Sequence, residues 1–352
     1  MSYKWNLKEA NFTKDKWSVF SCFGCWWGST MWYKLAWFDV IWINEIDPKI
    51  IEVYKANHNP KFAYCEWIQT FKDREDLPEE LYHLDILDWS PPCSSFSMAW
   101  NREKDWWKEK KFREWQANQV LDTLFFDFID LAKKLKPKVV VAENVKWILM
   151  WNAQKYVAKI LEEFDNAWYN IQFFTLNWKD MWVPQRRERV FFIGLRKDLC
   201  EPFLENYNLF EQKPFIDMTF NEREIPFSEI EEMWENIEWE TKTYDKVLDL
   251  WKKCEVWKSF DTVHERQSYF SYMKIDPARV LPTITANTNW WCPYHYKDPR
   301  TLSKRELLLA WAYPLDYDFW KVKVKYLVWM SVPPLMTKWI ANKIWDFWLS
   351  KL

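Results

Sequence analysis

Cys93 and Glu143 have the chemistry of a nucleophile and a proton donor, and each follows a short apolar run. Cys93 comes directly after Pro91 and Pro92, near a turn whose backbone N–H groups would lower the pKa of its thiol. A lone cysteine is more often a buried structural residue, so this one is not decisive by itself. Glu143 ends the β-branched run 139–142, where burial would raise its pKa and let it donate a proton. A helix-capping acid is the alternative there.

A third segment, residues 185–189, carries Gln185, Arg187 and Arg189 at alternate positions and leads into another apolar run. Side chains alternate across a strand, so these three would share one side, opposite Arg186 and Glu188. A solvated run of charge is the alternative interpretation of this segment.

The elements that must position these residues alternate between strand and helix. Strands are expected at residues 18–23, 38–43, 84–87, 139–142 and 190–195, and helices at 31–36, 50–57 and 120–135. This alternation predicts βαβ units and a parallel sheet covered on both faces. Ligands bind such sheets at the carboxyl ends of the strands. Those ends carry residues 24–28, Glu45, Cys93 and Glu143, so we expect the site there.

Beyond residue 196 the βα rhythm is lost. Residues 197–276 are acidic, aromatic and irregular, and we interpret them as part of a separate small lobe. The tail from residue 333 to residue 352 returns to helical spacing and has no obvious partner within that lobe.

Composition limits the classes of protein that fit. The formal net charge is -2, so no global basic field indicates a nucleic-acid partner, although a groove can be locally basic on a neutral protein. The seven cysteines are irregularly spaced, which argues against a disulfide framework and a structural metal and fits a reducing cytoplasm. The first 16 residues are too polar for a signal peptide, and no apolar run reaches membrane-spanning length.

Tryptophan and glycine are present in abnormal numbers. The chain has 30 Trp and 3 Gly, where about 25 Gly would be usual at this length. Many Trp stand at turns, such as Trp89 before Ser90 and Trp182 before Val183, where glycine supplies a backbone conformation that Trp does not favour. We therefore hypothesise that UGA codons read as Gly in the source organism are written here as Trp. A truly Trp-rich stacking protein is the alternative.

Taken in order along the chain, these segments resemble the motifs of the DNA (cytosine-5)-methyltransferase family, of bacterial or phage type. The matching segments are residues 23–28, 44–47, 91–93, 143–145, 185–189, 282–285, 300–306 and 331–334. Trp occupies expected Gly positions at residues 27, 89, 182 and 329, Cys25 stands where the first motif often has Gly, and Met330 replaces a more usual Asn. Six or more motifs in family order form a highly specific signal.

The resemblance implies an α/β fold: a Rossmann-like S-adenosylmethionine-dependent methyltransferase domain with a mostly parallel, doubly wound sheet, plus a smaller irregular target-recognition lobe. The catalytic and cofactor-binding domain would span residues 1–196 and be completed by a C-terminal helix at about residues 327–352, with the lobe at 197–326. The implied cofactor contacts are Phe23, Gly24, Gly28, Glu45, Ile46, Glu66, Pro91 and Ser331. The implied DNA contacts are Ser94, Ser97, Asn144 and Gln185.

The resemblance also implies a mechanism. A cytosine leaves the duplex, and the Cys93 thiolate attacks its C6. Protonated Glu143 would bind N3, Arg187 would hold O2, and Arg189 would orient the region around Cys93 and Glu143. The methyl group of S-adenosyl-L-methionine then moves to C5, and no metal takes part. The charged segment 94–115 follows the nucleophile directly, so we expect a lid over the flipped base rather than a solvated loop.

Three alternatives remain open. The same fold also hosts a tRNA cytosine methyltransferase, against which the long segment 197–276 argues moderately. A catalytically inactive DNA-binding relative is disfavoured by intact Cys93, Glu143, Arg187 and Arg189. A Trp-rich binding module is disfavoured by the ordered motifs. We expect a monomer that acts on duplex DNA in the cytoplasm, with a cognate restriction endonuclease as an optional partner.

Overall fold

A computed structural model describes residues 3–22, 28–90, 123–149, 154–206, 208, 211–232, 245–269, 272–284 and 293–352. Several residues singled out from the sequence lie outside these ranges: Phe23, Gly24, Trp27, Pro91, Cys93, Ser94 and Ser97, together with the expected lid at 94–115. Among the described helices, none is long and apolar enough to cross a membrane.

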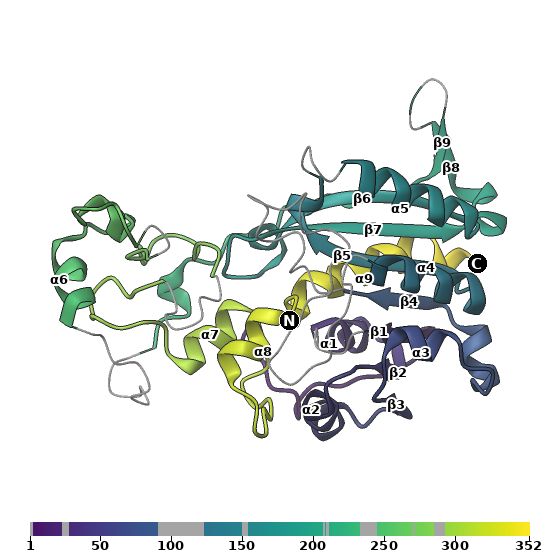
Figure 1. The fold of residues 1–352 in the computed structure, drawn as a ribbon, viewed down its shortest axis with the longest axis horizontal. Helices are drawn as coiled ribbons and strands as arrows, with labels where there is room; N and C mark the ends of the chain where they lie inside the picture. The colour runs from purple at the N-terminus through teal and green to yellow at the C-terminus, as the bar shows by residue number, and fades with distance from the viewer. Residues whose placement is uncertain are drawn as a thin grey trace.

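A seven-stranded sheet lies at the centre of the larger part of the molecule (Figure 1). Its strands are β1 Ser18–Cys22, β2 Asp39–Asn44, β3 Phe62–Tyr64, β4 Ile86–Trp89, β5 Val139–Val145, β6 Tyr169–Asn177 and β7 Glu188–Arg196. They are arranged in the order β3-β2-β1-β4-β5-β7-β6. The first five are parallel to one another, whereas β7 runs antiparallel to both β5 and β6. The predicted α/β fold with a mostly parallel, doubly wound sheet is confirmed.

Helices cover both faces of this sheet. One face packs on α1 Gly28–Leu35, α2 Pro48–His58 and α9 Pro334–Phe347, and the other on α3 Ile68–Lys72, α4 Leu124–Leu135 and α5 Gln154–Asn166. In β5, Val139 and Val141 join the first core, while Val140 and Ala142 join the second. Burial on both sides explains why β5 is a continuous apolar run rather than an alternating one.

The C-terminal helix belongs to this core. In α9, Trp345 packs edge-on against Phe38 and Trp17, and Leu335, Met336 and Ile340 are buried in the same cluster as α1. The predicted return of the tail to helical structure is confirmed. Residues 200–230 also place apolar side chains in this cluster, and Lys343 of α9 binds Asp217 at 2.9 Å.

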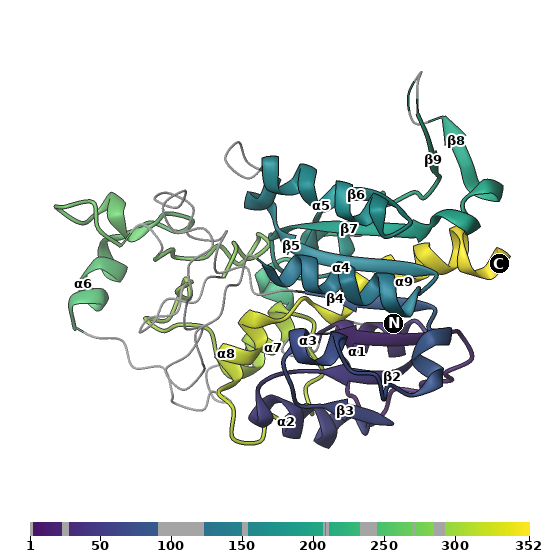
Figure 2. The ribbon, with the colours of Figure 1, turned by 45° about the vertical axis from the view of Figure 1, so that its right-hand side comes forward.

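The remaining elements are short. They are the hairpin of β8 Leu204–Asn206 and β9 Gln212–Pro214, the 3-10 turn η11 Phe227–Glu229, and the helices α6 Asp245–Lys253, α7 Lys304–Ala310 and α8 Val324–Met330. Residues 245–269 and 272–275, with Tyr294, form what we call the outer lobe, which has its own small core around Phe260 and Tyr272. Figures 1 and 2 show α6 on the far side of this lobe, well away from the sheet.

Candidate active site

The sheet brings its reactive side chains to one edge. Glu45 directly follows β2, Glu66 follows β3 and Glu143 lies near the end of β5, so their positions share the carboxyl edge of the parallel strands. Because β7 is antiparallel to β5, its beginning, with Arg187 just before it and Arg189 within it, reaches the same edge. The order of the sheet reverses between β1 and β4, which is where doubly wound folds bind their ligands.

Glu143 and Arg189 form a buried ion pair across β5 and β7. Glu143 is opposite Phe191 and Arg189 is opposite Val145, so the two are diagonal neighbours on one face. Arg189 Nε lies 2.8 Å from Glu143 Oε1, with side-chain exposures of 8% and 2%. The predicted role of Arg189, to orient the region around Glu143, is consistent with this contact.

The carboxyl of Glu143 is under two opposing influences. Burial raises its pKa, while the charges of Arg189 and Arg187 act to lower it, and burial is the larger influence. The net result is a carboxyl whose pKa is raised above its ordinary value. Such a group retains its proton to higher pH and can donate a hydrogen bond or a proton to a base placed against it.

Arg187 and Arg189 both lie against one aromatic ring that sequence reasoning did not identify. Trp178 begins the 3-10 turn η8 Trp178–Met181, and its ring centre lies 4.6 Å from Arg187 Cζ and 5.7 Å from Arg189 Cζ. The Trp178 backbone N–H donates to the Arg187 carbonyl at 3.0 Å, so the loop between them closes on itself. The signal in the sequence was Asn177, whose side chain caps this turn by accepting from the Lys179 N–H.

Gln185 is completely buried and binds protein groups. Its Nε2 donates to the Ala310 carbonyl at the end of α7, at 3.4 Å, and its Oε1 accepts from the Ile284 N–H at 3.3 Å. These contacts connect the segment before β7 to Ile284 and to α7. A DNA contact by Gln185 stays a prediction.

Asn144 occupies the opposite face of β5 from Glu143. It is 1% exposed, its Oδ1 accepts from the Val145 N–H at 2.8 Å, and Ala142, two residues earlier on the same face, belongs to the core formed by α4 and α5. The DNA contact predicted for Asn144 is likewise untested.

The acids expected at a cofactor differ in their surroundings. Glu45 is buried, and its Oε1 accepts from the N–H of Asp47, which in turn caps α2. Ile46 lies between them and is partly exposed. Glu66 instead pairs with Arg74 at 2.8 Å. The cofactor contacts predicted for Glu45, Ile46 and Glu66 stay predictions.

Gly28 and Ser331 lie at helix ends. Gly28 begins α1, immediately after residues 23–27. Ser331 directly follows α8 and is buried, with its hydroxyl donating to the Val328 carbonyl at 2.7 Å. The cofactor contacts predicted for these two residues stay predictions.

The sequence as a whole decides the family. The sequence model of the C-5 cytosine-specific DNA methylases matches residues 19–346, which run from β1 to α9. The chain belongs to this family. The predicted resemblance to DNA (cytosine-5)-methyltransferases is confirmed at that level.

Individual members of the methylase family align with this chain over different lengths. The type II methyltransferase M.FnuDI of Fusobacterium nucleatum is 37% identical over 183 residues, 52% of this chain and 47% of that protein, so the chain aligns with about half the length of this relative. The type II methyltransferase M1.HphI of Haemophilus parahaemolyticus is 26% identical over 332 residues, 90% of this chain and 83% of that protein. The crystal structure of the S. pombe Dnmt2 methyltransferase shares the fold, with a TM-score of 0.56 at 14% identity, over 94% of this chain and 98% of that one.

Proposed function

We propose that this chain transfers a methyl group from S-adenosyl-L-methionine to carbon 5 of a cytosine in duplex DNA. The observation that carries the proposal is the buried Glu143–Arg189 pair, with Arg187 beside it, at the carboxyl edge of the sheet in a member of the cytosine-specific family. A buried acid of raised pKa flanked by two guanidinium groups matches the N3 and O2 atoms of cytosine, which accept a proton and hydrogen bonds.

The reaction would proceed through a covalent adduct. A cytosine flipped from the duplex presents C6 to the Cys93 thiolate, and the new S–C6 bond transfers electron density into the ring. Glu143 supplies a proton or hydrogen bond at N3, Arg187 holds O2, and Arg189 keeps Glu143 in place. C5 then carries the methyl group, and loss of the C5 proton with expulsion of Cys93 gives 5-methylcytosine.

S-adenosyl-L-methionine would supply the electrophilic methyl carbon when bound. The residues present fit it at the edge formed by β1, β2 and β4. Glu45 offers a buried carboxylate for ribose hydroxyl groups, and Gly28 begins the helix that follows β1. We infer that Glu45 orients the ribose and that the adjacent turn at Ile46 borders the adenine.

The direct test incubates the chain with duplex DNA and S-adenosylmethionine labelled in its methyl group, in parallel with unmodified tRNA. We expect label in 5-methylcytosine recovered from the DNA digest and none above background in the tRNA. Label in tRNA alone would replace the DNA substrate with an RNA one. No label in either, across DNA of varied sequence, would contradict the proposed activity.

The division of the chain at residues 196 and 197, the monomeric state, the cytoplasmic location and a cognate restriction endonuclease all stay predictions. An inactive DNA-binding relative would retain the Glu143–Arg189 pair without turnover, so the same labelling experiment distinguishes it.

We also propose that many of the tryptophans stand at positions encoded as glycine, through UGA codons read as Gly. Five Trp have positive φ, the region that favours glycine: residues 37, 168, 182, 257 and 320, with φ between 45° and 72°. Trp37, Trp168 and Trp320 are each at least half exposed, so packing does not account for a large side chain there. Trp89 differs, since it stacks on Phe128 within the core. The coding DNA tests the proposal directly, because UGG at these codons would contradict it.

Gly and Ala variants test whether these positions require a residue that favours positive φ. Neither variant retains the indole, so a difference in stability between them does not reflect burial of the ring. At Trp37, Trp168 and Trp320 we expect the Gly variant to be more stable than the Ala variant by about 1 kcal/mol each, because Ala is strained at positive φ. At Trp339, inside α9, the order should reverse by a similar amount, since Ala is the better helix former. Chemical denaturation measures both differences. Ala variants as stable as Gly at the first three positions would count against the backbone argument.

A further inference from the structure

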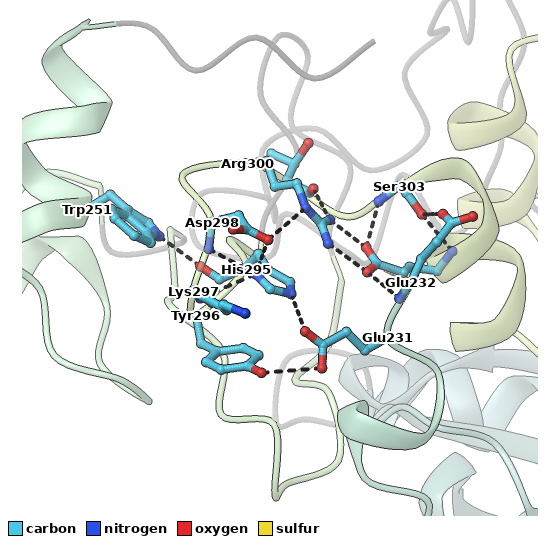
Figure 3. A network of polar contacts seen from close by, with 11 residues as sticks. Glu231, Glu232, Trp251, His295, Tyr296, Lys297, Asp298, Arg300 and Ser303 are labelled. Carbon is cyan, nitrogen blue, oxygen red and sulfur yellow. Dashed lines mark hydrogen bonds and ion pairs between the residues drawn. The ribbon is translucent and has the colours of Figure 1, made fainter. Parts of the chain in front are cut away.

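A buried polar network lies where the outer lobe meets α7. Figure 3 shows His295 at its centre, between Trp251 of α6 and the pair of adjacent glutamates Glu231 and Glu232, with Arg300 beside it. Glu231 and Glu232 follow η11 on the way into the outer lobe, and His295 follows Tyr294 on the way out. The network therefore joins both chain connections of that lobe.

The hydrogen bonds of His295 determine which of its nitrogens carries the proton. Nδ1 accepts from the backbone N–H groups of Lys297 and Asp298, at 3.2 and 3.1 Å. The proton therefore lies on Nε2, which donates to Glu231 Oε1 at 3.0 Å. The Asp298 carboxylate, 3.4 Å from Nδ1, is also 3.7 Å from Arg300 Nε, which compensates its charge.

His295 is neutral in this setting. Burial lowers the pKa of His295 to about 3, and the charges of Arg300 and Lys297 act in the same direction. Tyr296 donates to the second oxygen of Glu231 at 3.3 Å, so both carboxylate oxygens are engaged. The contact is thus a fixed hydrogen bond between a neutral imidazole and a carboxylate, unaffected by titration of the histidine over the ordinary pH range.

Glu232 extends the network to α7. The Ser303 hydroxyl donates to Glu232 Oε2 at 2.5 Å, and the Glu232 N–H donates to Glu306 Oε1 at 3.1 Å. Glu306 also holds Arg300 in a bidentate pair, at 2.7 and 2.9 Å, and is completely buried. Ser303 and Glu306 form the capping box of α7. Glu232 therefore binds α7, the helix that His295 itself does not contact.

The far end of α7 meets the active site. The Ala310 carbonyl, in its last turn, accepts from Gln185, two residues before Arg187. Arg186 is connected to residues 281–283, since its N–H donates to the Leu281 carbonyl at 2.8 Å and its carbonyl accepts from Thr283 at 2.7 Å. A continuous set of contacts thus runs from the stem of the outer lobe to the segment that carries Arg187.

We propose that the His295–Glu231 hydrogen bond is a positioning element that holds the outer lobe in register with the catalytic strand β7, so that DNA engages both together. The proposal rests on the proposed function for its substrate. Loss of the bond leaves the chemistry at Glu143 intact and releases the outer lobe, so its effect falls on DNA binding. His295 contacts no reacting atom and acts through Glu231 and α7.

Three variants separate the hydrogen bond from the bulk of the ring. His295→Asn retains an acceptor near Nδ1 and loses the donor to Glu231, whereas His295→Gln retains a donor that reaches Glu231. His264→Asn is the matched control. His264 lies in the same lobe, and its Nδ1 also accepts two backbone N–H groups, those of Arg266 and Ser268, but it lies outside the network.

Two measurements are made on the full chain: KM and kcat for duplex DNA, and amide hydrogen exchange in α6, β5 and β7. We expect His295→Asn to raise the KM for DNA about tenfold with kcat within about twofold, and to speed exchange in α6 only. His295→Gln should restore most of the KM, and His264→Asn should resemble the unaltered chain.

The results distinguish this proposal from the proposed function. Hydrogen exchange in α6 does not depend on turnover. If the chain transfers no methyl group, the enzymatic function is contradicted, but faster exchange in α6 of His295→Asn still supports the positioning role. Unchanged exchange and unchanged KM in His295→Asn would overturn that role. Equal loosening of β5 and β7 would also overturn it, because the bond would then support the whole fold.

Discussion

Cys93→Ala should reduce methyl transfer to duplex DNA by at least about 10⁴-fold, because loss of a catalytic nucleophile removes the covalent route altogether. Alanine cannot form the bond to C6 that activates C5 for methylation. DNA binding should persist, since phosphate contacts do not use the thiol. Methyl incorporation from labelled cofactor and gel-shift titration with the same duplex measure the two quantities.

The matched control is Cys65→Ala. Cys65 is an exposed thiol after β3, with its Sγ near the Ile46 carbonyl. This variant should transfer methyl groups at close to the original rate. A Cys93→Ala variant that still methylates DNA within tenfold of the unaltered chain would exclude the covalent mechanism.

Glu143→Ala should lower kcat by about 10²–10³-fold, the range typical for loss of one group that stabilises developing charge. The same change leaves Arg189 buried without its carboxylate, at 8% exposure, so a loss of stability of a few kcal/mol should accompany it. Thermal unfolding in the presence of cofactor separates the two effects. Glu143→Gln is the companion variant, since its amide can still donate to N3 but cannot give up a proton.

The pH dependence of kcat tests the protonated state of Glu143. Burial raises its pKa, so the protonated form persists below that raised value and is lost as pH rises through it. Activity that depends on the proton should therefore fall on the alkaline side of this pKa. In Glu143→Gln that limb should disappear. If the fall in kcat at alkaline pH has the same midpoint in both proteins, a group other than Glu143 causes it.

The sequence predicted those strands and helices that are buried on both faces or whose apolar residues are regularly spaced. The β-branched run 139–142 and the apolar run 190–195 predicted β5 and β7, and the helical spacing at 50–57 predicted α2. Two strands of the seven-stranded sheet were missed, as was the short hairpin of β8 and β9. β3 has only three residues, none of them buried, and β6 mixes Asn170, Gln172 and Thr175 with aromatic residues because it is an edge strand that is half exposed.

The site was predictable in its residue types but not in its pairings. Glu143, Arg187 and Arg189 could be named because each adjoins an apolar run. The position of the Trp178 ring beneath both arginines depends on the pairing of β6 with β7. The pairing of Glu66 with Arg74 depends on how the chain turns through α3. Gln185 shows the same limit, since its partners Ile284 and Ala310 lie about a hundred residues or more away.

The position of α9 has a consequence for how the molecule is made. Its Trp345 packs on Phe38 and Trp17, so the last long helix completes the face of the sheet that was begun by the first helix. During translation every strand of the sheet leaves the ribosome before α9 does. The nascent chain therefore keeps this apolar face of the sheet uncovered until α9 has also been made, and interruption before that point leaves a fragment prone to aggregate.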